Sequence, residues 1–288
     1  MLLSKVLAVQ GLVANFVHSE SPSRLSFNSL LLNDSVGDTT TSSNSILLDS
    51  LTNDGPVSIT NIPSFQHTKI NLMSNLHACI MSMNNGDDVP TQVFDDGTIR
   101  RSFATSTLPN GMGPQSIKTL DEYEQALRGS DSKLSTSCQH FNDHLASFRS
   151  TVDLVTRKFA ERLSVEMGTS LPKPLLSSSS NDGHGNYDDI KEIVEGGTQL
   201  EHFHSYQKEG SNDKKNGGVD ETATIDFHTD QGFFIAFTPG LIFSSDTSQD
   251  MELSDGFYIQ DSNGDKMLME FTGDDDLVFM LGDGVNQL

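Results

Sequence analysis

The sequence contains no tryptophan, only two cysteines, and fewer than half as many basic as acidic residues. Apolar residues make up 35% and aromatic residues 7% of the 288 positions, which predicts that part of the chain forms exposed loops. The 18 basic and 40 acidic residues give a net charge of −22, which disfavours nucleic acids and anionic membranes as general partners. A local basic pocket for a small acid is still compatible with this charge.

Cys79 and Cys138 can form at most one disulfide bond, and they do not form the Cys-x-x-Cys pair of thiolate zinc sites. We expect two free thiols, buried or half exposed, in preference to a disulfide bond. The two cysteines therefore do not indicate a cellular compartment.

Motifs of several other functional classes are absent. No glycine-rich phosphate loop follows a predicted strand, no Gly-x-Ser-x-Gly nucleophile turn occurs, and no segment is long enough to span a bilayer. Residues 261–265 and 273–276 are rich in Asp, but the first stretch lacks the helices and final Glu of an EF-hand. We interpret both as acidic turns, with a secreted calcium-binding β protein as a third functional alternative.

Residues 1–19 have features of a secretory signal peptide, with Lys5 before a mostly apolar stretch. Gln10 and Asn15 interrupt that stretch, so an amphipathic helix of a cytosolic protein is an equal alternative. The first interpretation implies the secretory pathway and the second the cytoplasm. Residues 20–55 have a centre rich in Asn, Asp, Ser and Thr, which predicts a flexible linker.

Residues 56–170 are expected to form an N-terminal α/β region. Apolar and polar residues alternate over 57–62, which predicts a strand, and an amphipathic helix is expected after it. The strongest helix signal covers 136–167, where apolar residues recur every three or four positions in one continuous stripe. We interpret the stripe as a packing surface. Its members are Phe141, Leu145, Phe148, Val152, Val155, Phe159 and Leu163.

Residues 190–288 alternate short apolar runs with turn residues, at spacings typical of antiparallel sheet. Helices thus precede strands along the chain, and this order predicts an α+β fold whose C-terminal half is a β-sandwich or barrel. The strands are expected at 233–237, 240–243, 256–260, 266–271 and 277–281.

His228 and Asp230 form the most specific chemical signal in the sequence. Residues two apart on a strand point to the same face, so an imidazole and a carboxylate would lie side by side. Two histidines and one carboxylate form the metal-binding triad of non-haem iron(II) oxygenases. The spacing alone is common by chance, and a hydrogen-bonded pair without a metal is the simpler alternative.

Residues 228–237 begin His-Thr-Asp-Gln-Gly and resemble the metal-binding strand of the isopenicillin N synthase-like iron(II)/2-oxoglutarate oxygenases. The strand and turn from Gly256 to Gly264 is similar to a later element of that family, and residues 276–283 are similar to its apolar strand ending in Gly-Asp. The three elements occur in family order. The resemblance implies a double-stranded β-helix (jelly-roll) core in the C-terminal half, with flanking helices from the N-terminal half.

The resemblance also implies a function. Such a protein would use iron(II), 2-oxoglutarate and O₂ to oxidise a small organic substrate, with His228 and Asp230 as metal ligands. A strand near His204 and Tyr206 would line the cosubstrate pocket, which makes these two residues candidates for contacts with 2-oxoglutarate. His202 and His204 are less favoured as substitute metal ligands, and a solvated or half-buried pair of histidines is the simpler interpretation.

The sequence departs from the family pattern after residue 283. The family supplies its second metal-binding histidine and a 2-oxoglutarate-binding arginine farther along, but no histidine follows His228 and the last basic residue is Lys266. We therefore expect a chain that is truncated before its metal site is complete. The alternative function is a catalytically inactive fragment or binding protein that keeps the oxygenase fold.

Overall fold

The structure is a computed structural model, and its described residues form an α+β fold, as predicted. It describes residues 5–8, 19–31, 46–82, 89–94, 97–107, 136–168, 175–176, 186–197, 199–207, 228–230, 232–242, 252–253, 257–261, 263–273 and 275–287. The helices are α1 (Phe27–Leu30), α2 (Ile46–Asn53), α3 (Phe65–Ser82), α5 (Thr136–Glu166), α6 (Ile190–Gly196) and the 3-10 helix η4 (Asp283–Gln287). The strands of the N-terminal half are β1 (Lys5–Ala8), β2 (Ser19–Glu20), β3 (Ser23–Ser26), β4 (Val57–Thr60), β5 (Thr91–Val93) and β6 (Ile99–Thr107). The later strands are β7 (Leu175–Leu176), β8 (Asn186–Tyr187), β9 (Gln199–Gln207), β10 (Phe234–Phe237), β11 (Leu241–Ile242), β12 (Glu252–Leu253), β13 (Phe257–Gln260), β14 (Lys266–Met269) and β15 (Leu277–Leu281).

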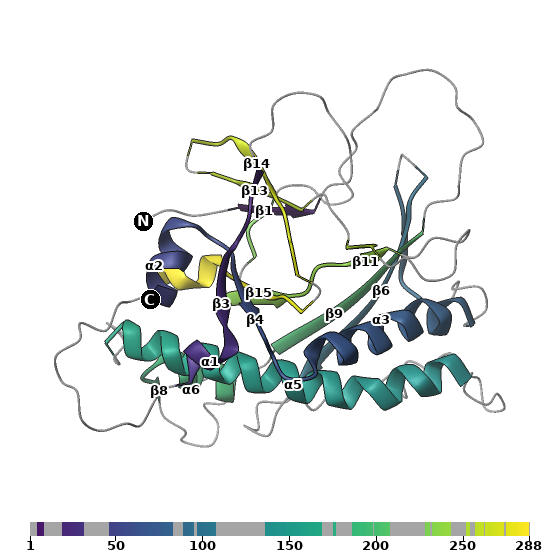
Figure 1. The fold of residues 1–288 in the computed structure, drawn as a ribbon, viewed down its shortest axis with the longest axis horizontal. Helices are drawn as coiled ribbons and strands as arrows, with labels where there is room; N and C mark the ends of the chain where they lie inside the picture. Colours follow the sequence, from purple (N-terminus) through teal and green to yellow (C-terminus); the bar gives the residue numbers. More distant parts are fainter. Residues whose placement is uncertain are drawn as a thin grey trace.

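Three sheets organise most of these strands (Figure 1). The strand orders are β10-β15-β4-β3, β1-β13-β14-β2 and β5-β6-β9, and β11-β12 and β7-β8 form two further pairs. In the first sheet, strands from the two ends of the chain are neighbours. Among the described strands, the sheets do not close into a barrel.

The two central strands of the sheet β10-β15-β4-β3, which are β15 and β4, are buried on both faces. On one face, Phe279 of β15 stacks on Phe159 of α5 with ring centroids 4.0 Å apart, and Phe234 packs edge-on against the same ring. On the other face, Met280 is buried in a second core with Ile259 of the β13–β14 hairpin. Because consecutive residues of a strand point to opposite faces, β15 contributes to a helix-covered core and to a sheet-on-sheet core.

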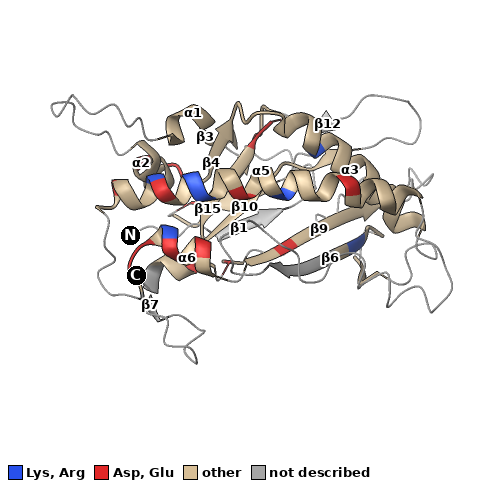
Figure 2. Cartoon of the chain, turned by 90° about the horizontal axis from the view of Figure 1, so that it is seen from below, with Lys and Arg blue, Asp and Glu red and all other residues tan. Residues whose placement is uncertain are grey.

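Helix α5 confirms the helix predicted over 136–167, and its apolar stripe faces the core. Helix α3 runs beside it, and β9 lies next to the two helices (Figure 1). Acidic and basic residues alternate along the other side of α5 (Figure 2), as in the ion pair between Arg157 and Asp153 at 2.8 Å. A pair of this kind contributes only about 0.3–0.5 kcal/mol, so the apolar stripe holds the helix in place.

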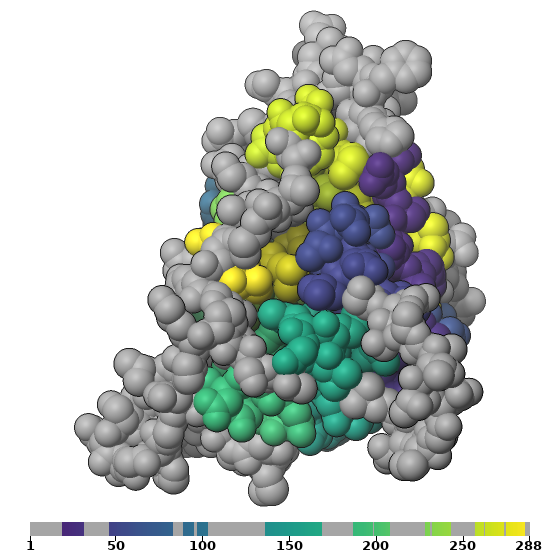
Figure 3. Space-filling view, turned by 90° about the vertical axis from the view of Figure 1, so that its left-hand side faces the viewer, coloured from purple at the N-terminus to yellow at the C-terminus, as the bar shows by residue number. Residues whose placement is uncertain are grey.

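Residues 20–55 do not form a linker throughout, contrary to the prediction. Strand β3 pairs in parallel with β4, and Leu47 and Leu51 of α2 are buried. The backbone N–H of Leu48 donates to Oε2 of Glu166 on α5 at 2.8 Å. Figure 3 shows α2 (blue) against both α5 (teal) and the C-terminal residues (yellow). Both elements are short, at four and eight residues, so contacts with distant parts of the chain stabilise them.

The N-terminal residues 5–8 form strand β1, which pairs antiparallel with β13, and not the helix considered for this segment. Residues 9–18 and Gly256 lie outside the described residues, so the signal peptide stays a prediction. None of the described helices combines the length and the apolar character needed to cross a membrane.

Cys79 and Cys138 form a disulfide bond, contrary to the expectation of free thiols. Both residues are buried, one on α3 and the other on α5. The sequence alone does not define the distance between these two helices, and isolated cysteines are usually free thiols. A bond across a sequence separation of 59 residues restricts the unfolded chain and thereby stabilises the folded one.

We therefore expect reducing agent to destabilise the protein. Reduction, or the double substitution Cys79→Ser and Cys138→Ser, should lower the free energy of unfolding by about 2–4 kcal/mol. Urea unfolding with and without a phosphine reductant measures the change. The double variant is the control, because the reductant should not alter its midpoint, and an equal response in both proteins would contradict the disulfide.

Candidate functional site

Backbone hydrogen bonds tie the segment of His228 and Asp230 to the Gly-Asp turn after β15. The N–H of Asp283 donates to the carbonyl oxygen of Asp230 at 2.7 Å, and the N–H of Gly282 donates to that of Phe233 at 2.9 Å. The antiparallel pairing of β10 with β15 continues directly from these bonds. Two of the three motif segments noted in the sequence are therefore neighbours in space.

Gly282 is the point of closest approach between these segments. A Cβ atom at Gly282 would lie 2.2 Å from the carbonyl oxygen of Gly232 and 2.9 Å from that of Asp230, both inside normal contact distance. A Cβ atom at Gly232, by contrast, would meet only the carbonyl oxygen of Phe234 at 3.6 Å. The turn therefore requires glycine at 282 because of backbone proximity.

His228 and Asp230 lie side by side, as their spacing predicts. Nε2 of His228 is 3.7 Å from Oδ1 of Asp230, and the side chains are 50% and 33% exposed. This distance is too long for a hydrogen bond between the two groups. Metal–ligand bonds are about 2.0–2.2 Å long, so one ion could reach both atoms, and a small side-chain rotation would bring them closer to a right angle at the ion. The pair thus fits two positions of a metal site.

A complete metal site is not assembled by the described residues. No third His, Cys, Asp or Glu among them joins His228 and Asp230 in a group that could hold a metal ion. His202 and His204, the less favoured substitutes, lie on β9, which belongs to a different sheet from β10.

Strand β9 has two chemically different faces. Phe203 and Ser205 are buried, and Phe203 packs against the aromatic rings of α5. His202, His204 and Tyr206 point to the opposite face and are exposed. The ring centroids of His204 and Tyr206 are 6.2 Å apart, so the two residues named for a cosubstrate pocket share one surface.

The environment of His204 favours its neutral form. Oγ of Ser102 lies 2.7 Å from Nδ1 of the imidazole. Although His204 is partly exposed, burial by the surrounding protein lowers its pKa to about 4, with further lowering by the charges of Arg100 and His202. Burial raises the pKa of Tyr206, while a hydrogen bond with Arg100 and its positive charge act in the opposite direction.

Arg100 and Ser102 were not among the residues predicted from the sequence to form a site. The two residues are two positions apart, and alternation along a strand places both on one face. The pairing of β6 with β9, which sets Arg100 opposite Tyr206 and Ser102 opposite His204, is a long-range contact. The spacing of Arg100 and Ser102 could indicate that they share a strand face, but it could not identify β9 as the neighbouring strand.

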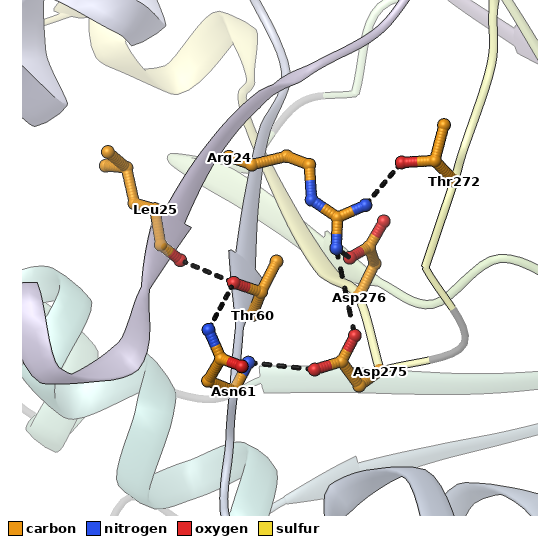
Figure 4. Close-up of polar contacts among 7 residues, drawn as sticks. All are labelled: Arg24, Leu25, Thr60, Asn61, Thr272, Asp275 and Asp276. Atoms are coloured by element: carbon orange, nitrogen blue, oxygen red, sulfur yellow. Dashed lines mark hydrogen bonds and ion pairs between the residues drawn. The ribbon is translucent and has the colours of Figure 1, made fainter.

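Arg24 of β3 contacts the acidic turn before β15 (Figure 4). The guanidinium Nη2 lies 3.0 Å from Oδ1 of Asp276 and 3.8 Å from Oδ1 of Asp275, and Nη1 donates to Thr272. Asp276 is fully buried, and this burial raises the pKa of its carboxyl while the charge of Arg24 opposes the rise. Arg24 therefore places a positive charge beside the carboxylates that the calcium interpretation paired with a metal ion.

The second acidic stretch forms the turn of the β13–β14 hairpin, as interpreted from the sequence. Oδ1 of Asp261 accepts the backbone N–H groups of Asn263 and Asp265, each at 2.8 Å. These hydrogen bonds lower the pKa of the Asp261 carboxyl. The side-chain amide of Asn263 also donates to Oδ2 of Asp261 at 3.2 Å, so Asp261 stabilises the hairpin turn through contacts within it.

No protein-family model matches the sequence, and a search of curated proteins finds no significant relative. The functional assignment below therefore depends on the residues and geometry described above.

Replacing Gly282 with alanine should disrupt the contact between the two motif segments. The added methyl group must displace backbone, so we expect a loss of about 1–3 kcal/mol in unfolding free energy. Gly232→Ala is the matched control, because its methyl group meets only an ordinary contact. Urea unfolding of both variants measures the difference, and equal stabilities would contradict the close approach.

His204 should make stability depend on pH. Its folded-state pKa of about 4 is below its ordinary value of 6.5, so the unfolded chain takes up a proton first as pH falls. The free energy of unfolding is therefore unaffected by His204 above pH 6.5, and it falls as the pH is lowered from 6.5 to 4. We expect His204→Gln to lose less stability than the wild type between pH 7 and 5, as measured by urea unfolding, while the exposed His67→Gln control follows the wild type.

Proposed function

We propose that this chain is an iron(II)/2-oxoglutarate oxygenase-like protein in which His228 and Asp230 supply two metal ligands. The observation that carries the proposal is the set of backbone hydrogen bonds between the His-x-Asp segment and the Gly-Asp turn. The resemblance relates these segments only through their order in the sequence. Their contact across some fifty residues gives independent support, because a chance match would not require the two segments to be neighbours.

A jelly-roll core is part of the same proposal. It is supported by the second core, where the β13–β14 hairpin packs on the β10–β15 pair. The aromatic rings of Phe237 and Phe257 are 4.9 Å apart across this interface. Helix α5 covers the opposite face of β10 and β15. Two facing layers of antiparallel strands with a helix outside are consistent with this architecture.

The proposed chemistry assigns simple roles to the chain's own residues. His228 would bind iron(II) through a neutral imidazole nitrogen, and Asp230 would bind through an ionised carboxylate oxygen. Both side chains are accessible, so a metal ion and a small organic substrate can reach them from solution. When bound, iron(II) would supply coordination positions for 2-oxoglutarate and O₂, which is the chemistry needed to oxidise that substrate.

One observation favours the alternative function, an inactive fragment or binding protein that keeps this fold. Two ligands hold a metal ion more weakly than three, and no third ligand joins them within the described ranges. Metal affinity and turnover of 2-oxoglutarate distinguish the two functions.

The test is anaerobic titration of iron(II) into the full chain by calorimetry. We expect measurable binding by the wild type and at least about tenfold weaker binding by His228→Ala and Asp230→Asn, the effect of removing one ligand of a weak site. His67→Ala is the matched control, since it removes an exposed imidazole on α3. Unchanged binding by His228→Ala would contradict the metal site.

Formation of succinate from 2-oxoglutarate, measured in the same samples, then separates the two functions. Iron-dependent turnover that is lost in His228→Ala supports the oxygenase. Metal binding at His228 without any turnover supports the binding protein.

A further inference from the structure

The exposed face of the β6–β9 sheet carries the polar groups of an anion site. Cross-strand pairing places Gln92 beside Arg100, Arg100 beside Tyr206, and Ser102 beside His204. Residues paired in this way project from the same face of a sheet. The side chains form connected contacts, since Arg100 donates to Gln92 at 2.6 Å and to Tyr206.

The charge of Arg100 is not balanced by these partners. Gln92 and Tyr206 are neutral, and no ion pair joins Arg100 to an Asp or Glu among the described residues. The nearest acidic residue along β9, Glu201, projects from the other face, where it pairs with Arg149 of α5. Among its described residues, this face therefore presents a guanidinium and hydrogen-bonding groups without a carboxylate, in a chain of net charge −22.

The guanidinium is also held in position. The ring of Phe94 lies 5.6 Å from its central carbon, an arrangement typical of a cation–π contact. Two neutral partners use only part of the five N–H donors of an arginine. The remaining donors can form the paired hydrogen bonds that a planar carboxylate accepts.

We propose that the exposed face of β6 and β9 binds a small carboxylate anion through Arg100, with Ser102, His204 and Tyr206 as hydrogen-bonding contacts. Arg100 contributes the charge-assisted contact, and Tyr206 and the hydrogen-bonded pair of Ser102 and His204 each offer a donor. The assignment of this anion as the 2-oxoglutarate cosubstrate rests on the proposed function, but its binding does not.

The test is titration of succinate and of 2-oxoglutarate into the metal-free full chain in the presence of a chelator, measured by calorimetry. We expect both acids to bind and the uncharged succinamide not to bind. Arg100→Gln should weaken binding at least about tenfold, which corresponds to the loss of a hydrogen bond to a charged group. Ser102→Ala should weaken it by a smaller factor.

Arg157→Gln is the matched control, because it changes the net charge equally at an exposed position on α5. Equal weakening by both arginine variants, or no binding by the wild type, would overturn the proposal. Tighter binding of inorganic phosphate than of succinate would overturn the carboxylate assignment. Because the titrations contain no metal, they can succeed where iron binding at His228 fails, and the two proposals are tested separately.

Discussion

The stacking of Phe159 on Phe279 joins the two halves of the molecule. Phe159 belongs to a helix whose apolar stripe also packs on α3 and β9, and Phe279 lies in the central part of the sheet formed by the chain ends. A ring pair of this kind adds about 0.5–1.5 kcal/mol beyond the burial of its area. Its greater effect is geometric, because β15 positions both the Gly-Asp turn and, through β10, the segment of His228.

The elements that could be predicted from the sequence are those whose periodicity is complete within one segment. The stripe from Phe141 to Leu163 defined α5, and short apolar runs defined β10, β13, β14 and β15. Strand β3 and helix α2 could not be predicted, since both are short and their apolar residues become buried only against distant parts of the chain. The Cys79–Cys138 bond depends on how two helices cross, which no local pattern specifies.

The candidate site also combines features that follow from local sequence with features that depend on distant contacts. The side-by-side placement of His228 and Asp230 follows from strand spacing, and so does the shared face of His204 and Tyr206. The close approach at Gly282 and the position of Arg100 could not be predicted, because each depends on which strand lies next to another. Arg24 is the extreme case, since it contacts an acidic turn about 250 residues away. The spacing of residues along the sequence identifies side chains that could bind a ligand. The order of strands in the sheets determines which of these side chains lie close together.

The two polar surfaces differ in the sign of the ligand proposed for each. His228 and Asp230 present an imidazole and a carboxyl group side by side, and the net charge of −22 attracts cations to such a pair. An anion at the β6–β9 face would bind against that same field, which requires a local cation and no carboxylate nearby. Arg100 meets the first condition. Among the described residues, Glu201 meets the second, because it projects from the opposite face of β9 and pairs with Arg149. The pairing of Arg149 with Glu201 therefore contributes to the electrostatics of a face that neither residue touches.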